Sequence, residues 1–139
     1  MLQRKQSIFM SLTAILMIIA LFVPIGIVTY DQQLFIMDHM PLMLITLTVI
    51  GLQGYNLSLY KSRKKQLKLN YYAILALALL AGTAHYYAHD TPLIFDYQMI
   101  LKKATWGSSI PVLGIISQIL AIRGIKQDEA LIKSMNRFR

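Results

Sequence analysis

The sequence contains no cysteine, and this absence removes several kinds of chemistry at once. Disulfide bonds, thiolate metal sites and cysteine nucleophiles are all excluded. Charged residues are also scarce, at 14% of the chain, whereas a soluble domain usually has about 25%. Hydrophobic residues make up 56% of the 139 residues. This balance predicts a single domain that is surrounded mainly by lipid rather than by water.

Asp, Glu, Lys and Arg are absent from four long windows of the sequence. Each window is long enough for a helix to cross the hydrocarbon layer, which takes roughly 17–25 residues. One charge near the bilayer centre costs about 2.5–3.5 kcal/mol, so gaps of this length indicate membrane spans. The prediction is an all-α membrane protein, an up-down bundle of four transmembrane helices with a short amphipathic C-terminal helix. The expected spans are about 8–29, 41–60, 69–88 and 105–123, followed by a cytoplasmic tail, 124–139.

The basic residues fall almost entirely on one side of this arrangement. If the N-terminus is cytoplasmic, only Lys102 and Lys103 lie on the outer side. This asymmetry follows the positive-inside rule and predicts that both termini are cytoplasmic. The first apolar run is longer than the roughly 7–15 residues of a signal-peptide core, so we expect it to be retained. The net charge of +8 does not indicate nucleic-acid binding, because long apolar runs separate the basic residues.

Prolines and one short apolar stretch mark irregular points. We expect Pro24 to bend the first helix and Pro111 to kink the fourth or break its first turn. Residues 91–103 are too short to cross the membrane. They fit an interfacial helix or an early start of the fourth span, and the sequence does not decide between these alternatives.

Polar side chains are rare inside the spans, and none of the deep ones is ionisable. This absence argues against proton-coupled transport, and no enzyme motif is present, so no enzymatic activity is expected. The deepest polar residues are Gln53, Asn56 and Gln118. Their simplest role is to join helices, at about 0.6 kcal/mol per hydrogen bond, as does the small-xxx-small pair Gly54 and Ser58. The alternative is a polar path in a small transporter or channel subunit that forms a homo-oligomer.

All three histidines, His39, His85 and His89, lie near the predicted outer face. His85 and His89 have i,i+4 spacing, which suits a divalent metal or a haem iron. Two histidines without an E-x-x-H context are only weakly specific, so packing beside tyrosines is the preferred interpretation. We therefore predict no cofactor and keep outer-face metal or haem binding as a second alternative.

The tail after residue 123 combines basic and apolar residues at helical spacing. Such a helix lies on the membrane surface or binds a protein, and Gly124 is the expected joint. Asp128 interrupts the apolar face; we expect a solvated carboxylate, or else a contact with the basic loop 61–68. The candidate partner-binding or membrane-surface residues are Arg123, Lys126, Asp128, Glu129, Leu131, Lys133 and Arg137.

The two ends of the chain resemble a known family. The opening MLQRKQS carries Gln3, Arg4, Gln6 and Ser7, and the closing AIRGIKQDEALIKSMNRFR carries Arg123, Ile125, Lys126, Asp128, Glu129, Leu131, Ser134 and Arg137. These motifs resemble the ends of small bacterial inner-membrane proteins grouped as domain of unknown function 4293. Gln127, Met135, Asn136 and Phe138 depart from the family pattern. The resemblance implies a four-helix inner-membrane protein and supplies no activity.

Together these observations predict a non-enzymatic accessory or interaction protein of the bacterial inner membrane. Its partners are expected to be the lipid bilayer and a protein bound at the cytoplasmic loop and tail. Nucleic acid is not an expected partner.

Overall fold

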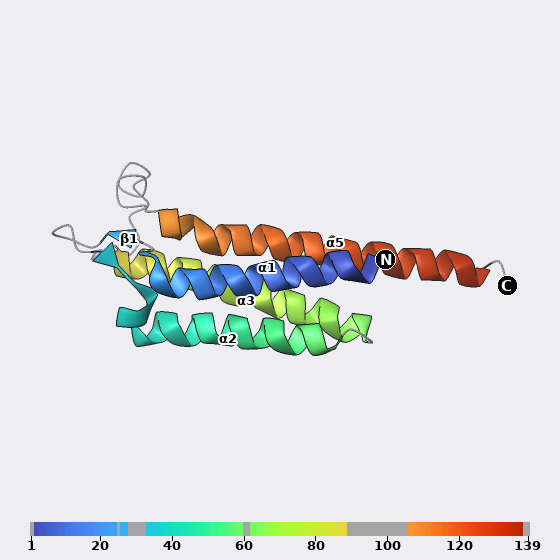
Figure 1. Ribbon diagram of the computed structural model, residues 1–139, viewed down its shortest axis with the longest axis horizontal. Helices are drawn as coiled ribbons and strands as arrows, with labels where there is room; N and C mark the ends of the chain where they lie inside the picture. Colours follow the sequence, from blue (N-terminus) through green and yellow to red (C-terminus); the bar gives the residue numbers. More distant parts are fainter. Residues whose placement is uncertain (1, 25, 28–32, 60–61, 89–105, 138–139) are drawn as a thin grey trace.

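The computed structural model describes residues 2–24, 26–27, 33–59, 62–88 and 106–137. Within them lie four long helices, whose directions alternate along the chain (Figure 1). They are α1 (Leu2–Phe22), α2 (Met40–Ser58), α3 (Arg63–Ala88) and α5 (Ile110–Arg137). The all-α, up-down fold is therefore confirmed.

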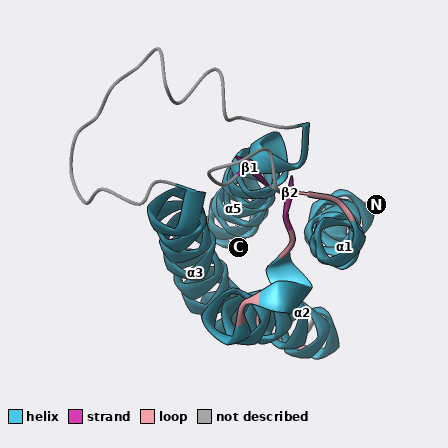
Figure 2. Ribbon diagram, turned by 90° about the vertical axis from the view of Figure 1, so that its left-hand side faces the viewer, coloured by secondary structure: helices cyan, strands magenta, loops and turns pink. Residues whose placement is uncertain are grey.

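The helices form a closed ring when the bundle is viewed end-on (Figure 2). Each helix packs against the helices before and after it in the chain, and α5 also packs against α1. The beginning of α1 and the end of α5 lie toward the same end of the bundle (Figure 1). We call this the basic end, because Lys64, Lys65 and Lys126 are exposed there. The opposite end, which carries two short strands, is the hairpin end.

The first helix ends earlier than expected. Helix α1 stops at Phe22 and does not continue to residue 29. Pro24 follows the helix end and does not bend a continuing helix, in line with the rule that helices commonly end before proline. Beyond it, β1 (Gly26–Ile27) pairs antiparallel with β2 (Gln33–Leu34). A 3-10 helix, η2 (Ile36–Asp38), then leads into α2.

The second and fourth predicted spans begin as proline chemistry suggests. Pro41 occupies the first turn of α2, where a missing N–H costs nothing. Pro111 is the second residue of α5, and a 3-10 helix, η3 (Trp106–Ser109), precedes it. The expected irregularity at Pro111 therefore lies at the helix start. Residues 91–103 lie outside the described part of the chain.

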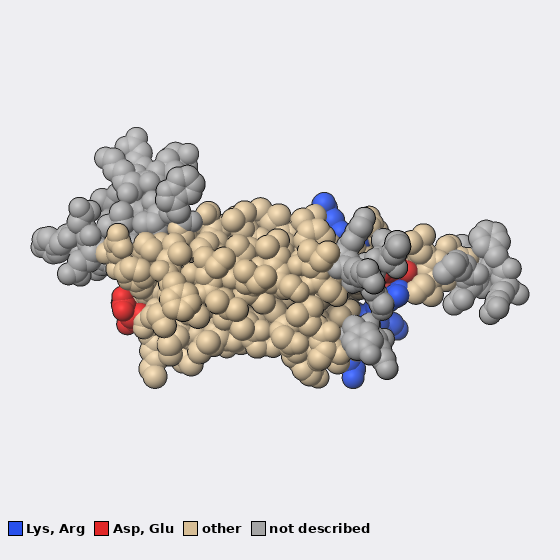
Figure 3. Space-filling model, viewed as in Figure 1, with Lys and Arg blue, Asp and Glu red and all other residues tan. Residues whose placement is uncertain are grey.

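Large apolar side chains cover the outside of the bundle. Leu75, Ile15 and Ile116 are 67%, 53% and 49% exposed. Figure 3 shows a broad middle zone of the visible face without Lys, Arg, Asp or Glu. Among the described residues, α2, α3 and α5 are long and apolar enough to cross a membrane, and α1 adds a shorter apolar stretch, Gln6–Phe22. The protein is thus a multi-pass membrane protein whose surface contacts lipid.

The interior differs between the two ends. Toward the hairpin end it is an apolar cluster that includes Met17, Leu42, Val49, Leu77 and Leu80. Toward the basic end the described residues form a smaller buried apolar cluster of Met10, Ala121 and Ile125. Most of the other described interior positions of that half are polar and are described below, with Ala73 and Ile122 as apolar exceptions.

Two glycine positions show where backbones approach closely and where they do not. A Cβ on Gly107 would collide with the carbonyl oxygen of Pro24, so η3 lies directly on the chain that follows α1. A Cβ on Gly54 would meet nothing within 4 Å, and Ser58 is exposed. The predicted small-xxx-small contact is therefore not made with any described residue, because that face of α2 points outward.

Candidate functional site

Helix α5 runs past residue 123 without a break and ends at Arg137. The expected joint at Gly124 is therefore wrong. Gly124 instead permits close packing, because a Cβ there would lie 3.0 Å from the Cγ of Gln6. The C-terminal amphipathic segment is the continuation of α5 and projects beyond the start of α1 (Figure 1).

Asp128 is the main correction to the interpretation of the tail. Its side chain is only 4% exposed, so it is not a solvated carboxylate. Its Oδ2 accepts a hydrogen bond of 2.5 Å from the Nε2 of Gln6, which is itself 4% exposed. The observed hydrogen-bond partner of Asp128 is thus on the first helix, and among the described residues no hydrogen bond joins it to the basic loop. Burial is possible because a hydrogen bond offsets part of the desolvation of the carboxylate.

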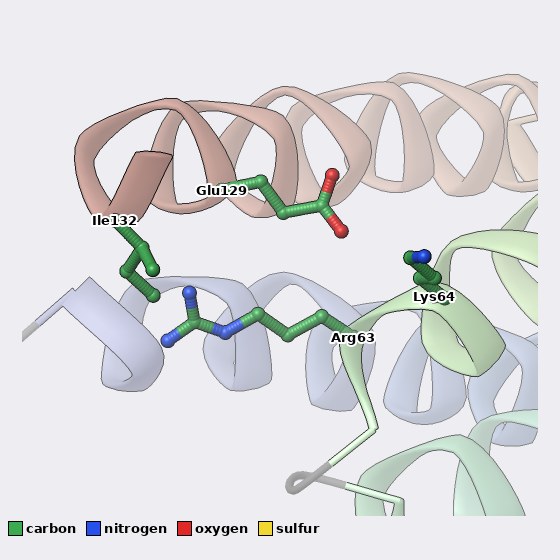
Figure 4. Close-up of a pocket in the computed structure, with 4 residues that line it drawn as sticks. All are labelled: Arg63, Lys64, Glu129 and Ile132. Atoms are coloured by element: carbon green, nitrogen blue, oxygen red, sulfur yellow. The ribbon is translucent and has the colours of Figure 1, made fainter. Parts of the chain in front are cut away.

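A groove of about 270 Å³ lies between the start of α3 and the far part of α5. Arg63 and Lys64 line it from α3, and Glu129 and Ile132 line it from α5 (Figure 4). The Arg63 guanidinium extends toward Ile132, whereas the Glu129 carboxylate lies toward Lys64. One guanidinium nitrogen, NH1 of Arg63, is buried and has no hydrogen-bond partner among the described residues. The groove therefore combines an apolar side chain with two cationic side chains and one carboxylate.

The other candidate tail residues divide by exposure. Arg123 and Lys126 are exposed, and the Nζ of Lys126 lies 6.0 Å from the centre of the Tyr71 ring. Leu131 is 51% exposed on the far part of α5. The side chains of Lys133 and Arg137 lie outside the described part of the chain.

The three predicted intramembrane polar residues are all fully buried. Asn56 of α2 donates from Nδ2 to the Oδ1 of Asn70 on α3 at 2.6 Å. Gln118 of α5 donates from Nε2 to the Oγ1 of Thr13 on α1 at 2.8 Å. These two bonds join neighbouring helices, as the helix-joining interpretation predicts. Gln53 differs, because neither of its amide atoms has a hydrogen-bond partner among the described residues.

Several interior polar residues were not singled out by the sequence. Gln66 donates to the backbone oxygen of Asn56 at 3.1 Å, and Ser117 donates to the backbone oxygen of Phe9 at 2.7 Å. Gln66 and Asn70 follow the charged loop, so in the sequence they look like polar residues at the membrane surface rather than in the bundle interior. Their i,i+4 spacing was the available signal, since it places both amides on one face of a helix.

Two of the three histidines, His39 and His85, are in the described part of the chain. The His39 ring lies 4.5 Å from the Tyr87 ring, centre to centre, and His85 is half-buried in α3. His89 lies outside the described residues. Within the described ranges, no three His, Cys, Asp or Glu side chains are grouped so that they could hold a metal ion.

Comparison with known proteins identifies the family. Residues 2–138 match the model of a family described as domain of unknown function (DUF4293). Neither the curated proteins nor the solved structures gave a match. The family match covers nearly the whole chain, including both terminal motifs and the helices between them. The chain therefore belongs to the DUF4293 family.

Proposed function

We propose that this integral membrane protein is a non-enzymatic accessory protein whose basic end faces the cytoplasm. There it binds an acidic segment of a cytoplasmic protein in the groove between α3 and α5. The observation that carries the proposal is the groove itself, which places Arg63 and Lys64 beside the apolar side chain of Ile132. Its topology follows from the positive-inside rule.

The chemistry of the groove favours an acidic occupant. Two cationic side chains and one carboxylate line it, and an Arg63 nitrogen has no hydrogen-bond partner in the described structure. Arginine forms strong, directional hydrogen bonds with carboxylates. Ile132 is 40% exposed and Leu131 is 51% exposed, so an apolar residue next to the acidic one gains contact area. The fitting partner segment carries Asp or Glu next to large apolar side chains.

The position of the groove favours a protein over a lipid headgroup. Arg123 is the first charged residue after the apolar part of α5. At about 1.5 Å per residue, Ile132 lies about 13 Å farther along the helix. The headgroup region is only about 5–8 Å thick on each side. Because α5 continues along the bundle axis, Ile132 is carried past the headgroups when the bundle stands upright in the bilayer.

Site-specific photocrosslinking in the native membrane tests this function. A photoreactive residue at position 132 is expected to trap a protein through a peptide that contains Asp or Glu. The same residue at Ile116, which is exposed in the apolar zone of α5, is the matched control and is expected to give lipid adducts. The protein adduct at position 132 must disappear in Arg63→Glu. Lipid adducts alone at position 132, or a protein adduct that persists in Arg63→Glu, would contradict the proposal.

Homo-oligomer formation remains a prediction beside this proposal.

A further inference from the structure

The polar half of the bundle interior contains more hydrogen-bonding groups than its helices use. Gln53, Asn56, Asn70 and Gln118 are each 0% exposed. Both amide atoms of Gln53, the Oε1 of Gln118, the Oδ1 of Asn56 and the Nδ2 of Asn70 have no hydrogen-bond partner in the described part of the chain. Buried polar groups in folded proteins are normally satisfied by protein or by bound molecules. The unused donors and acceptors therefore point to an additional binding partner.

Contacts between helices place two of these amides at the same depth. A Cβ on Gly114 would lie 3.2 Å from Leu77 and 3.6 Å from Met17, so these residues share a layer. The next layer lies one helical turn closer to the basic end. It contains Thr13 of α1, Ala73 of α3 and Gln118 of α5. The bond between Thr13 and Gln118 confirms that they are level.

Gln53 is the residue of α2 that lies at the depth of this layer. Asn56 and Asn70 are bonded to each other, which fixes the register of α2 against α3. One turn farther toward the hairpin end, Gln53 is therefore level with Ala73. Gln53 and Gln118 stand on α2 and α5, which lie diagonally across the ring (Figure 2). Both side chains are fully buried, as is Ala73, so the two amides lie in the bundle interior at the same depth.

The chemistry of this layer selects the ligand. The unused Nε2 of Gln53 is a donor, and the unused Oε1 atoms of Gln53 and Gln118 are acceptors. None of these groups carries a charge that would neutralise an ion. Polar residues continue from the layer to Asn56, Gln66 and Asp128 at the basic end, whereas the apolar cluster fills the hairpin half.

We propose that Thr13, Gln53 and Gln118 form a binding site for small uncharged molecules that both donate and accept hydrogen bonds, water being the smallest. The site is reached from the basic end and is closed toward the hairpin end by the apolar cluster. It is independent of the docking groove, since no residue is shared with it.

Cysteine labelling provides one test, because the natural chain has no cysteine. Single variants Gln53→Cys and Gln118→Cys are treated with methyl methanethiosulfonate, a small neutral thiol reagent, and the modified fraction is followed by mass spectrometry. Val49→Cys, equally buried but in the apolar cluster, is the control. The reactive form of a thiol is the thiolate, which requires hydration, so the two site variants are expected to react at least about tenfold faster than the control. Equal, slow reaction of all three would overturn the proposal.

Two methionines of the unmodified protein provide a test that no substitution can disturb. Met10 lies in the polar half and Met17 in the apolar cluster, and both are 0% exposed. X-ray radiolysis generates hydroxyl radicals from nearby bound water, and these radicals oxidise methionine to its sulfoxide. Positions 10 and 17 of α1 both lie within about one helical turn of Thr13. Oxidation is therefore expected at both methionines, and no oxidation at either would refute the site. Added glycerol then distinguishes the occupants in the labelling of Gln53→Cys. Slower labelling in glycerol identifies a solute larger than water, and rapid labelling that glycerol does not slow identifies water alone; both results support the site.

Discussion

Gln6 and Asp128 form a buried hydrogen bond although they are 122 residues apart in the sequence. One lies in the opening motif and the other in the closing motif through which the chain resembles its family. The bond joins the beginning of α1 to α5 one turn beyond Gly124, where Gln6 also packs. The two terminal motifs thus meet in space and close the ring of helices at the basic end.

Replacing Gln6 tests the contribution of this bond. Gln6→Leu is expected to lower the free energy of unfolding by about 1.5–3 kcal/mol, because a hydrogen bond to a charged group is lost and the carboxylate stays buried. Asp128→Asn is expected to retain most of the stability, since asparagine still offers an acceptor oxygen to Gln6. SDS titration of the detergent-solubilised protein measures both values. If Asp128→Asn loses as much as Gln6→Leu, the negative charge itself is needed at this position.

The pair Asn56 and Asn70 offers a second measurement, of the polar contact between α2 and α3. A double-mutant cycle with Asn56→Leu and Asn70→Leu is expected to give a coupling energy of about 0.6–1.7 kcal/mol, the range found for hydrogen bonds between membrane helices. The bond from Gln66 to the backbone of Asn56 survives in all variants and does not enter the cycle. Unfolding in SDS again gives the energies. A coupling energy near zero would mean that these amides do not hold the two helices together.

The helices were predictable from the sequence because their charge-free windows are long and the charges gather at the ends. Burial of Gln53, Asn56 and Gln118 was predictable for a similar reason: polar residues deep within a span avoid lipid by turning inward. The helix end at Phe22 was not predictable from hydropathy. The following residues, VPIGIVT, are as apolar as the helix, and hydropathy does not distinguish a helix from a short strand.

Burial of Asp128 could not be derived from its own helix. A helical wheel shows that Asp128 shares the apolar face, but not which polar group faces it from elsewhere in the chain. That partner is Gln6, and the relationship becomes visible only when α1 and α5 are packed together. The same reason explains why Thr13 was not singled out: its role depends on Gln118 of α5.

Packing at the hairpin end leads to a third prediction, based on two glycines. Gly107→Ala is expected to destabilise the protein by about 1–3 kcal/mol, because the new Cβ would collide with the backbone of Pro24, which cannot turn aside as a side chain can. Gly54→Ala is the matched control and is expected to be neutral or stabilising by up to about 1 kcal/mol, since its Cβ meets open space within a helix. Thermal unfolding in detergent compares the two. Equal stability of both variants would show that η3 does not press on the end of α1.

The distribution of charge gives the final prediction, which concerns the side of the membrane that each end occupies. Exposed basic residues at the ends of α3 and α5, including Lys64, Lys65 and Lys126, mark one end of the bundle, whereas Asp38 is exposed at the other. Positively charged segments are retained in the cytoplasm during insertion. Green fluorescent protein becomes fluorescent in the cytoplasm but not after export in an unfolded state. When it is fused after Arg139 it should therefore be bright, and alkaline phosphatase fused after Asp38, which is active only outside the cytoplasm, should be active. The reverse activities would place the docking groove on the outer side and remove its access to any cytoplasmic partner. Changing the charges tests the cause directly: replacing Lys64, Lys65 and Lys68 by Gln should raise the fraction of inverted molecules, whereas replacing the same three residues by Arg, which keeps the charge, should not.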